Sequence, residues 1–213
     1  MWTDGYNALF RLEYGETWYC KGCRKLIFSD PINNFVNTKT HTEPEFGFPA
    51  VGIRREKEET VRRATVRKMA DECRMTRHAC PAGKCGSSAT VMRRYRIEAA
   101  PEYLRVALGL VRYHSGGPSK IMHSVKVERI LDLTDLQRDP STPLHYRLIC
   151  VTSHQGPSFE TGHRITAVQG PGQKYYAIND DIVRKETEHY MTMNPHDGSE
   201  ATILIYKSTR PSK

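Results

Sequence analysis

The sequence predicts an α+β protein whose second half is mostly antiparallel β-sheet. Polar and apolar residues alternate through residues 146–153, which is the period of a half-buried strand. Residues 155–161 and 170–172 are rich in Gly, Pro or Ser, and such stretches favour turns between strands. We therefore expect the strands of one sheet near residues 103–110, 126–129, 146–153, 164–169, 175–179 and 202–206.

One helix is expected in the first half, within the charged segment 54–77. This segment contains no Pro or Gly, and Val61, Ala64 and Met69 recur at a loosely helical spacing. Its many basic residues are mixed with acidic ones, which is typical of a solvated surface helix.

The length and the cysteine content restrict the class of protein. The 213 residues suffice for one sizeable domain, or for one domain with a smaller lobe. No apolar run approaches the roughly 18 residues of a membrane span, and the first residues do not have the pattern of a signal peptide. We therefore expect a cytoplasmic or nuclear protein, in which the six cysteines stay reduced and serve metal binding or catalysis.

The net charge of +8 makes nucleic-acid binding the main competing class of function. Much of the excess lies in segment 54–77, where acidic residues interrupt the basic ones. No aromatic side chains alternate with these arginines, so bases would have nothing to stack on. Charge of this kind usually supports solubility and weak nonspecific attraction, and we expect no dedicated nucleic-acid partner.

Two pairs of cysteines have the spacing of metal-binding knuckles. Cys20 and Cys23 form a C-x-x-C motif, and Cys80 and Cys85 enclose four residues. A short turn lets both sulfurs of a pair reach one metal at about 2.3 Å, so the pairs predict a closed four-cysteine zinc site. Because a closed site has no open coordination position, this zinc would stabilise the fold and take no part in chemistry.

Other interpretations of the cysteines remain open. Because the second pair is loosely spaced, Cys73 or His78 is the nearest substitute ligand, and the four thiols can also be unrelated. Cys150 lies inside an alternating strand segment, where a free cysteine usually behaves as a small apolar residue. We assign Cys150 no chemistry.

A glycine-histidine pair, Gly162 and His163, is the most informative motif. It stands where a loop re-enters a strand, and glycine lets the backbone turn without a Cβ clash, so the imidazole can face a cleft. Asn179 can supply an amide oxygen that holds such an imidazole in one tautomer. The two residues are interpreted as two thirds of a catalytic triad. Taken alone, His163 can equally be a packed or solvated histidine, and the Asn-Asp-Asp sequence at 179–181 can be an ordinary turn.

Two blocks, in this order, resemble the ubiquitin-specific protease family, the papain-like cysteine deubiquitinases. The upstream block, residues 100–113, 120–121 and 125–133, looks like the strand pair that follows the zinc-binding fingers of the family. The downstream block is similar to its C-terminal His box, with S-H-Q-G at 153–156, G-H-R-I-T-A-V at 162–168, Y-Y-A-I-N-D-D-I-V at 175–183 and A-T-I-L-I-Y at 201–206.

The resemblance implies the fold in more detail. Residues 1–100 are expected to form a zinc-ribbon-like fingers region that carries both knuckles and the charged helix. Residues 101–213 are expected to form the antiparallel palm sheet of a papain-like cysteine protease fold, with His163 and Asn179. The N-terminal thumb of the family fold is missing.

The resemblance also implies a reaction, the hydrolysis of the bond after the C-terminal glycine of ubiquitin or a ubiquitin-like protein. In the complete mechanism a cysteine thiolate attacks the carbonyl carbon, and His163 takes the thiol proton and later protonates the leaving amine. Asn179 orients the imidazole, and Asp180 polarises a water or the Asn179 amide.

The family's nucleophile lies in a block that resembles G-N-T-C-Y-M-N, at the start of a long helix that lowers the pKa of the thiol. Nothing similar occurs here, and the first cysteine, Cys20, belongs to a knuckle. Loss of the nucleophile typically lowers the rate by about 10⁶-fold. We therefore expect a truncated gene product or an inactive pseudoenzyme, and the alternative is a noncatalytic ubiquitin-binding or scaffolding module.

Two further positions depart from the family pattern. Arg164 follows the histidine where the family commonly has tyrosine, and Tyr175 stands where tryptophan is common. Because successive strand residues point to opposite faces, Arg164 need not approach the imidazole of His163. If it does, its positive charge would disfavour the imidazolium that the mechanism requires.

Overall fold

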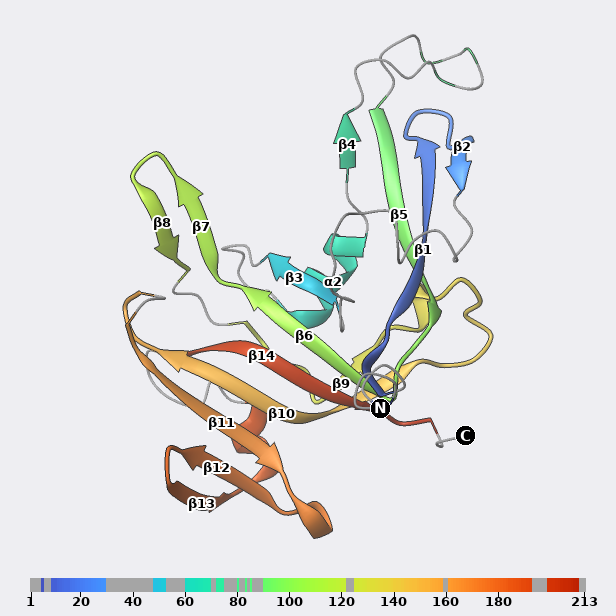
Figure 1. Cartoon of the computed structure of the whole chain (residues 1–213). Helices are drawn as coiled ribbons and strands as arrows, with labels where there is room; N and C mark the ends of the chain where they lie inside the picture. The colour runs from blue at the N-terminus through green and yellow to red at the C-terminus, as the bar shows by residue number, and fades with distance from the viewer. Residues whose placement is uncertain are drawn as a thin grey trace.

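Two β-sheets and a short hairpin make up most of this computed structural model (Figure 1). The four-stranded sheet rises from one end of the eight-stranded sheet, and the hairpin stands at the other end. The structure describes residues 5, 9–29, 48–52, 60–69, 72–74, 80, 83, 85, 90–121, 125–158, 161–192 and 199–210.

The four-stranded sheet is a long antiparallel ribbon with the order β2-β1-β5-β4. Its central pair extends from Glu13, opposite Ala99, to Cys20, opposite Val91, with one register shift between Glu13 and Tyr14. Cys20 therefore lies at the end that is remote from the large sheet. The strands are β1 (Glu13–Cys20), β2 (Leu26–Ser29), β4 (Glu72–Arg74) and β5 (Thr90–Ala99).

The eight-stranded sheet has the order β13-β12-β11-β10-β14-β6-β3, and β9 also pairs with β10. All pairs are antiparallel except β3 with β6. The strands are β3 (Phe48–Gly52), β6 (Tyr103–Gly109), β9 (Ile130–Asp132), β10 (His145–Gln155), β11 (His163–Gln169), β12 (Tyr175–Asn179), β13 (Ile182–Glu186) and β14 (Ser199–Ser208). The hairpin consists of β7 (Val111–His114) and β8 (Gly117–Lys120).

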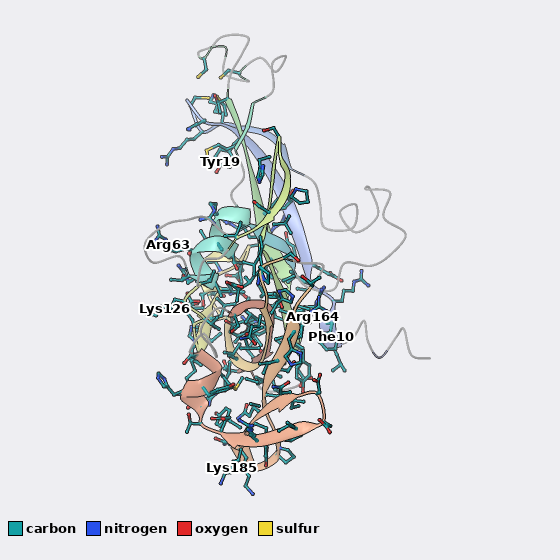
Figure 2. All side chains as sticks on the ribbon, turned by 90° about the vertical axis from the view of Figure 1, so that its left-hand side faces the viewer. Phe10, Tyr19, Arg63, Lys126, Arg164 and Lys185 are labelled. Atoms are coloured by element: carbon teal, nitrogen blue, oxygen red, sulfur yellow. The ribbon has the colours of Figure 1, made fainter. Side chains whose placement is uncertain are left out.

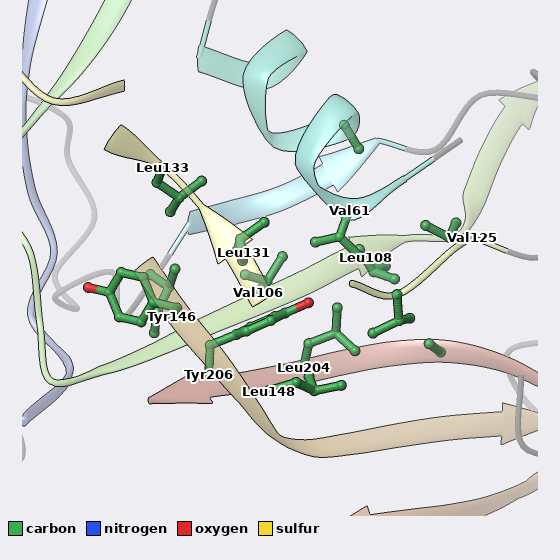
Figure 3. Close-up of a cluster of buried hydrophobic side chains, with 14 of the residues drawn as sticks. Val61, Val106, Leu108, Val125, Leu131, Leu133, Tyr146, Leu148, Leu204 and Tyr206 are labelled. Carbon is green, nitrogen blue, oxygen red and sulfur yellow. The ribbon is translucent and has the colours of Figure 1, made fainter. Parts of the chain in front are cut away.

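The main core lies against the eight-stranded sheet (Figure 3). Alternate residues of β6 are buried, which is the pattern of a strand with one covered face. Two tyrosines are almost completely buried, and each hydroxyl donates to a backbone carbonyl, Tyr146 to Pro101 at 2.7 Å and Tyr206 to Glu128 at 3.0 Å. Burial raises the pKa of both phenols, so they remain protonated donors.

The expected helix is present as α2 (Val61–Met69), but it is not a solvated surface helix. Val61, Ala64 and Met69 are buried in the main core, so one side of the helix packs inward. The Glu128 carboxylate accepts hydrogen bonds from the Val61 and Arg62 amides, which stabilises the helix N-terminus. The predicted helical segment is also too long, because β4 begins at Glu72; residues 54–59, 70–71 and 75–77 lie outside the described residues.

Five of the six strands expected from the sequence are confirmed as β6, β10, β11, β12 and β14. The strand expected at 126–129 is wrong, because Lys126 makes only an isolated bridge to Thr60 and the strand β9 begins at Ile130. The Lys126 carbonyl and the Glu128 side chain bond to the start of α2 instead. Edge strand β13 and helix α3 (Glu188–Thr192) were not anticipated.

None of the helices in the described part of the chain has the length and hydropathy that a membrane crossing requires.

Candidate functional site

Adjacent strands bring His163 and Asn179 together. His163 is the first residue of β11 and Asn179 the last of β12. The antiparallel register pairs Thr166 with Ile178, which places Asn179 opposite Ile165, two residues from His163. Since side chains alternate between faces, His163 and Asn179 are diagonal neighbours on the same face.

The two side chains form a short hydrogen bond. His163 Nε2 lies 2.5 Å from Asn179 Oδ1, and because the amide oxygen can only accept, Nε2–H is the donor. The proton of the neutral ring is thereby held on Nε2, and Nδ1 keeps its lone pair. Through Nδ1 the imidazole can therefore act as a base.

Asp180 lies at the edge of this arrangement. Its Oδ2 is 3.9 Å from His163 Nε2, and its side chain is 78% exposed. The residue adopts a positive φ of 52°, which Asp tolerates better than most residues. This distance is too long for a hydrogen bond, so Asn179 and not Asp180 is the hydrogen-bond partner of the ring.

The imidazole stands where the core meets solvent. Further along the same face Ile165 and Ala167 are buried, whereas the His163 side chain is 40% exposed. Gly162 before it is exposed, and a Cβ there would collide with the Gln155 carbonyl and the ring of His154. Only glycine therefore allows β11 to begin at this point.

Arg164 points away from His163, as the alternation of the strand predicts. It pairs with His154 across β10 and β11, so these two residues share the opposite face. Burial first, and then the charges of Lys120 and Arg164, lower the pKa of His154. The positive charge of Arg164 thus acts on His154.

Cys150 is not placed to attack a substrate beside His163. It pairs with Val168, which puts it on the face opposite to His163 and Gln155. Gln155 lies five positions after Cys150, a distance of about 16 Å along β10. Burial raises the pKa of the Cys150 thiol, so it is a weak nucleophile as well as a distant one.

The two cysteine pairs meet at the tip of the four-stranded sheet. All four sulfurs, of Cys20, Cys23, Cys80 and Cys85, lie within 4.8 Å of one another, and none is in a disulfide. Four sulfurs around a tetrahedral zinc ion would be about 3.8 Å apart. The cluster can therefore hold a metal ion. Of the two substitute ligands considered, His78 and the side chain of Cys73 lie outside what the structure describes.

Local sequence explains the approach of the pairs. Cys20 is anchored by β1, and its carbonyl accepts a bond from the Arg24 amide at 2.7 Å, which closes the first knuckle. A Cβ on Gly22 would lie only 2.9 Å from Cys85 Sγ, so glycine lets the second pair come close.

The crowded thiols affect one another. Hydrogen bonds with Cys80 and Cys20, together with burial, raise the pKa of Cys85 to about 12. Four thiolates at this spacing would repel one another strongly, and a divalent cation bound between them reverses that effect.

Figure 2 shows Tyr19, the neighbour of Cys20, at the opposite end of the molecule from Lys185 of β13. The cysteine cluster and the histidine site are thus separate.

Comparison with known sequences identifies relatives of one kind. The sequence model of the ubiquitin carboxyl-terminal hydrolase family matches residues 3–206. Ubiquitin carboxyl-terminal hydrolase 10 of Saccharomyces cerevisiae is 27% identical over 128 residues, which are 60% of this chain and 16% of that protein. Ubiquitin carboxyl-terminal hydrolase 17-like protein A of Mus musculus is 28% identical over 104 residues, 48% of this chain and 19% of the relative.

Solved structures with the same fold include those of the SAGA DUB module of Ubp8, Sgf11, Sus1 and Sgf73. The structure bound to monoubiquitin superimposes with a TM-score of 0.74 at 16% identity, over 97% of this chain and 42% of that chain. The structure bound to ubiquitin aldehyde gives a TM-score of 0.72 at 15% identity, over 97% of this chain and 43% of that chain. The chain therefore spans less than half the length of each of these relatives and structures.

Proposed function

The chain belongs to the ubiquitin carboxyl-terminal hydrolase family, and we propose that it supplies the histidine and the asparagine of a thiol-dependent ubiquitin hydrolase. The observation that carries this proposal is the 2.5 Å hydrogen bond from His163 Nε2 to Asn179 Oδ1. It links two side chains from adjacent strands, and in the neutral ring it leaves Nδ1 without a proton.

Each residue has a defined part in the proposed reaction. Nδ1 of His163 takes the proton of an approaching thiol, and the resulting thiolate attacks the carbonyl carbon of the last glycine of ubiquitin. The imidazolium then gives the same proton to the leaving amine, which leaves ubiquitin as a thioester on the cysteine. Water, deprotonated by Nδ1, then hydrolyses the thioester and restores the thiol. Asn179 keeps the ring in place throughout, and Asp180, whose carboxylate lies 3.9 Å from the ring, polarises a water or the Asn179 amide.

Ubiquitin or a ubiquitin-like protein is the partner we propose. Structures of the same fold contain monoubiquitin or ubiquitin aldehyde. The four-stranded sheet would contact the globular body of ubiquitin, and the C-terminal tail would reach the exposed side of His163. We assign no part in the interaction to nucleic acid or to a membrane.

The positions of the cysteines decide where the thiol comes from. Of the five cysteines whose side chains the structure describes, four form the cysteine cluster that can hold a metal ion, and Cys150 lies on the face opposite to His163. We propose that the attacking thiol belongs to a segment other than the described residues. The same positions favour a second candidate function, noncatalytic binding of ubiquitin as a scaffold.

We propose zinc as the metal of the cysteine cluster, because four thiolates in a closed tetrahedral set are typical of structural zinc. Such a site needs reduced thiols, which persist in the cytosol and the nucleus, so we place the protein in one of these compartments. The zinc would hold the tip of the four-stranded sheet and have no role in the hydrolysis.

The test of the catalytic proposal is a fusion protein, in which the thiol-bearing segment of a family enzyme precedes residue 1 of this chain. We expect the fusion to hydrolyse a fluorogenic amide of the ubiquitin C-terminus, whereas each part alone does not. A folded fusion that binds ubiquitin but shows no turnover above the separate parts would contradict the catalytic proposal and support the scaffold.

The isolated 213-residue chain is expected to remain unlabelled by a ubiquitin probe with a C-terminal electrophile. The five cysteines whose side chains the structure describes are either in the cysteine cluster or on the opposite face from His163, so we expect none of them to present an activated thiol to the probe. Intact-protein mass spectrometry measures the adduct. A stoichiometric adduct that disappears when one cysteine is replaced by serine would identify that cysteine as a nucleophile within this chain.

A further inference from the structure

A buried lysine contacts the backbone at the start of the connection that leads from β10 to His163. Lys120, the last residue of β8, has no exposed side-chain surface, and its Nζ is 2.6 Å from Glu200 Oε2 at the start of β14. A buried ammonium is costly unless it is paired. Because apolar residues of similar volume often stabilise such a position equally well, stability alone does not account for this ion pair.

The ammonium group of Lys120 also has two backbone acceptors. Nζ donates to the carbonyl of His154 at 3.2 Å and to the carbonyl of Gly156 at 2.5 Å. These carbonyls flank Gln155, the residue that pairs with His163 across β10 and β11. Lys120 thus holds the backbone on both sides of the residue that faces His163.

Direct contacts continue from Gly156 to His163. We call Gly156, Thr161 and Gly162 the loop base. A Cβ on Gly156 would be 2.7 Å from the Thr161 carbonyl, and one on Gly162 would collide with the Gln155 carbonyl and the His154 ring. The two ends of the loop base are therefore in close contact, and His163 follows immediately.

The hairpin that carries Lys120 is otherwise separate from the sheet of the site. β7 and β8 form their own two-stranded sheet, which stands above the end where β10 turns toward β11 (Figure 1). Glu200 pairs with His154 in the large sheet. The ion pair consequently joins three segments, the hairpin, β14 and the end of β10, at the loop base.

We propose that Lys120 and Glu200 are positioning residues, which hold the loop base so that the His163 ring stays aligned with Asn179. Neither residue touches the reacting atoms, and both act through the backbone of β10 and the loop base. The expected effect on kcat rests on the function proposed above. The alignment of the His163 ring can be measured in the isolated chain, without any hydrolysis.

The decisive variant replaces both charges, Lys120→Met together with Glu200→Gln, because Lys120→Met alone leaves a buried carboxylate unpaired. We expect this double variant to keep the circular dichroism spectrum and zinc content of the parent. In the fusion protein, kcat falls by about 10- to 100-fold with little change in KM, since a misplacement of about 1 Å can cost 10²-fold. Lys207→Met, which removes a partly exposed ion pair with Glu102, is the matched control and leaves kcat unchanged.

A second readout uses the isolated chain and needs no hydrolysis. In a side-chain ¹⁵N spectrum, the parent His163 shows one tautomer with its proton on Nε2, and the double variant shows exchange between two tautomers. Glu200→Gln alone keeps an acceptor for Lys120, so we expect a smaller change in the tautomer signals of His163. This single variant replaces the double variant in the test if the double variant does not fold. An inactive parent fusion would count against the proposed function, and the tautomer would still test the positioning.

A folded double variant with unchanged kcat and a single His163 tautomer would overturn the proposal and leave the ion pair a purely structural feature. The same conclusion follows if Glu200→Gln leaves the tautomer and kcat unaltered when the double variant cannot be studied.

Discussion

Replacing Cys20 by serine is expected to abolish binding of one zinc ion per chain and to unfold the tip of the four-stranded sheet. The buried side chains at that tip are the cysteines themselves, so among the described residues they form a cluster separate from the main core. A structural zinc contributes about 10–16 kcal/mol of binding free energy in zinc-finger peptides near neutral pH. Without the metal, we expect amide hydrogen exchange to accelerate in β1, β2 and the start of β5, while the eight-stranded sheet keeps its protection.

The matched control is Cys150→Ser, which alters a cysteine outside the cluster and should leave the zinc content unchanged. Metal analysis and hydrogen exchange with mass spectrometry report the two effects. Two results would show that the cluster is not a structural metal site. Either Cys20→Ser retains one zinc per chain, or a chelator removes the zinc from the parent without any change in amide hydrogen exchange.

In the fusion protein, His163→Gln is expected to lower kcat by about 10⁶-fold, as loss of the histidine does in a comparable triad. Asn179→Ala keeps the base but loses the 2.5 Å bond that fixes its tautomer, so we expect a smaller loss of about 10⁴-fold. Both variants should retain KM, because these side chains act on the thiol and the transition state and do not hold the body of ubiquitin. Steady-state hydrolysis of the ubiquitin amide measures both parameters.

Arg164→Gln is the matched control, since Arg164 adjoins His163 in sequence but lies on the opposite face of β11. An exposed substitution of this kind should change the rate only slightly. Equal losses in Arg164→Gln and His163→Gln would mean that disturbance of the strand, and not loss of the base, explains the effect.

Much of the histidine site was predictable because its signals are local. Gly162 with His163 and the strand that ends at Asn179 follow from turn residues and from a period of two, and the structure places the side chains as expected on adjacent strands. The same alternation along a strand places Arg164 and Cys150 on the face opposite to His163, outside the site. The cysteine cluster was predictable for the same reason, because short spacing brings paired thiols together.

What the sequence did not reveal depends on contacts between distant segments. Lys120 and Glu200 are 80 positions apart, and nothing near either residue indicates that its charge is buried. The buried side of α2 was missed because its charges resemble those of a surface helix, whereas its partners lie in the core of the large sheet. Residues 126–129 have strand-like composition, but their backbone and side chains bond to the start of α2.

The most direct test of the central claim is the side-chain ¹⁵N spectrum of His163 while ubiquitin is added to the isolated chain. We expect the ring signals to shift with full-length ubiquitin and to stay in place with ubiquitin that lacks its C-terminal tail, although the tip of the four-stranded sheet responds to both. Ring signals that do not move when full-length ubiquitin saturates the protein would contradict the assignment of His163 to the site that receives the ubiquitin C-terminus.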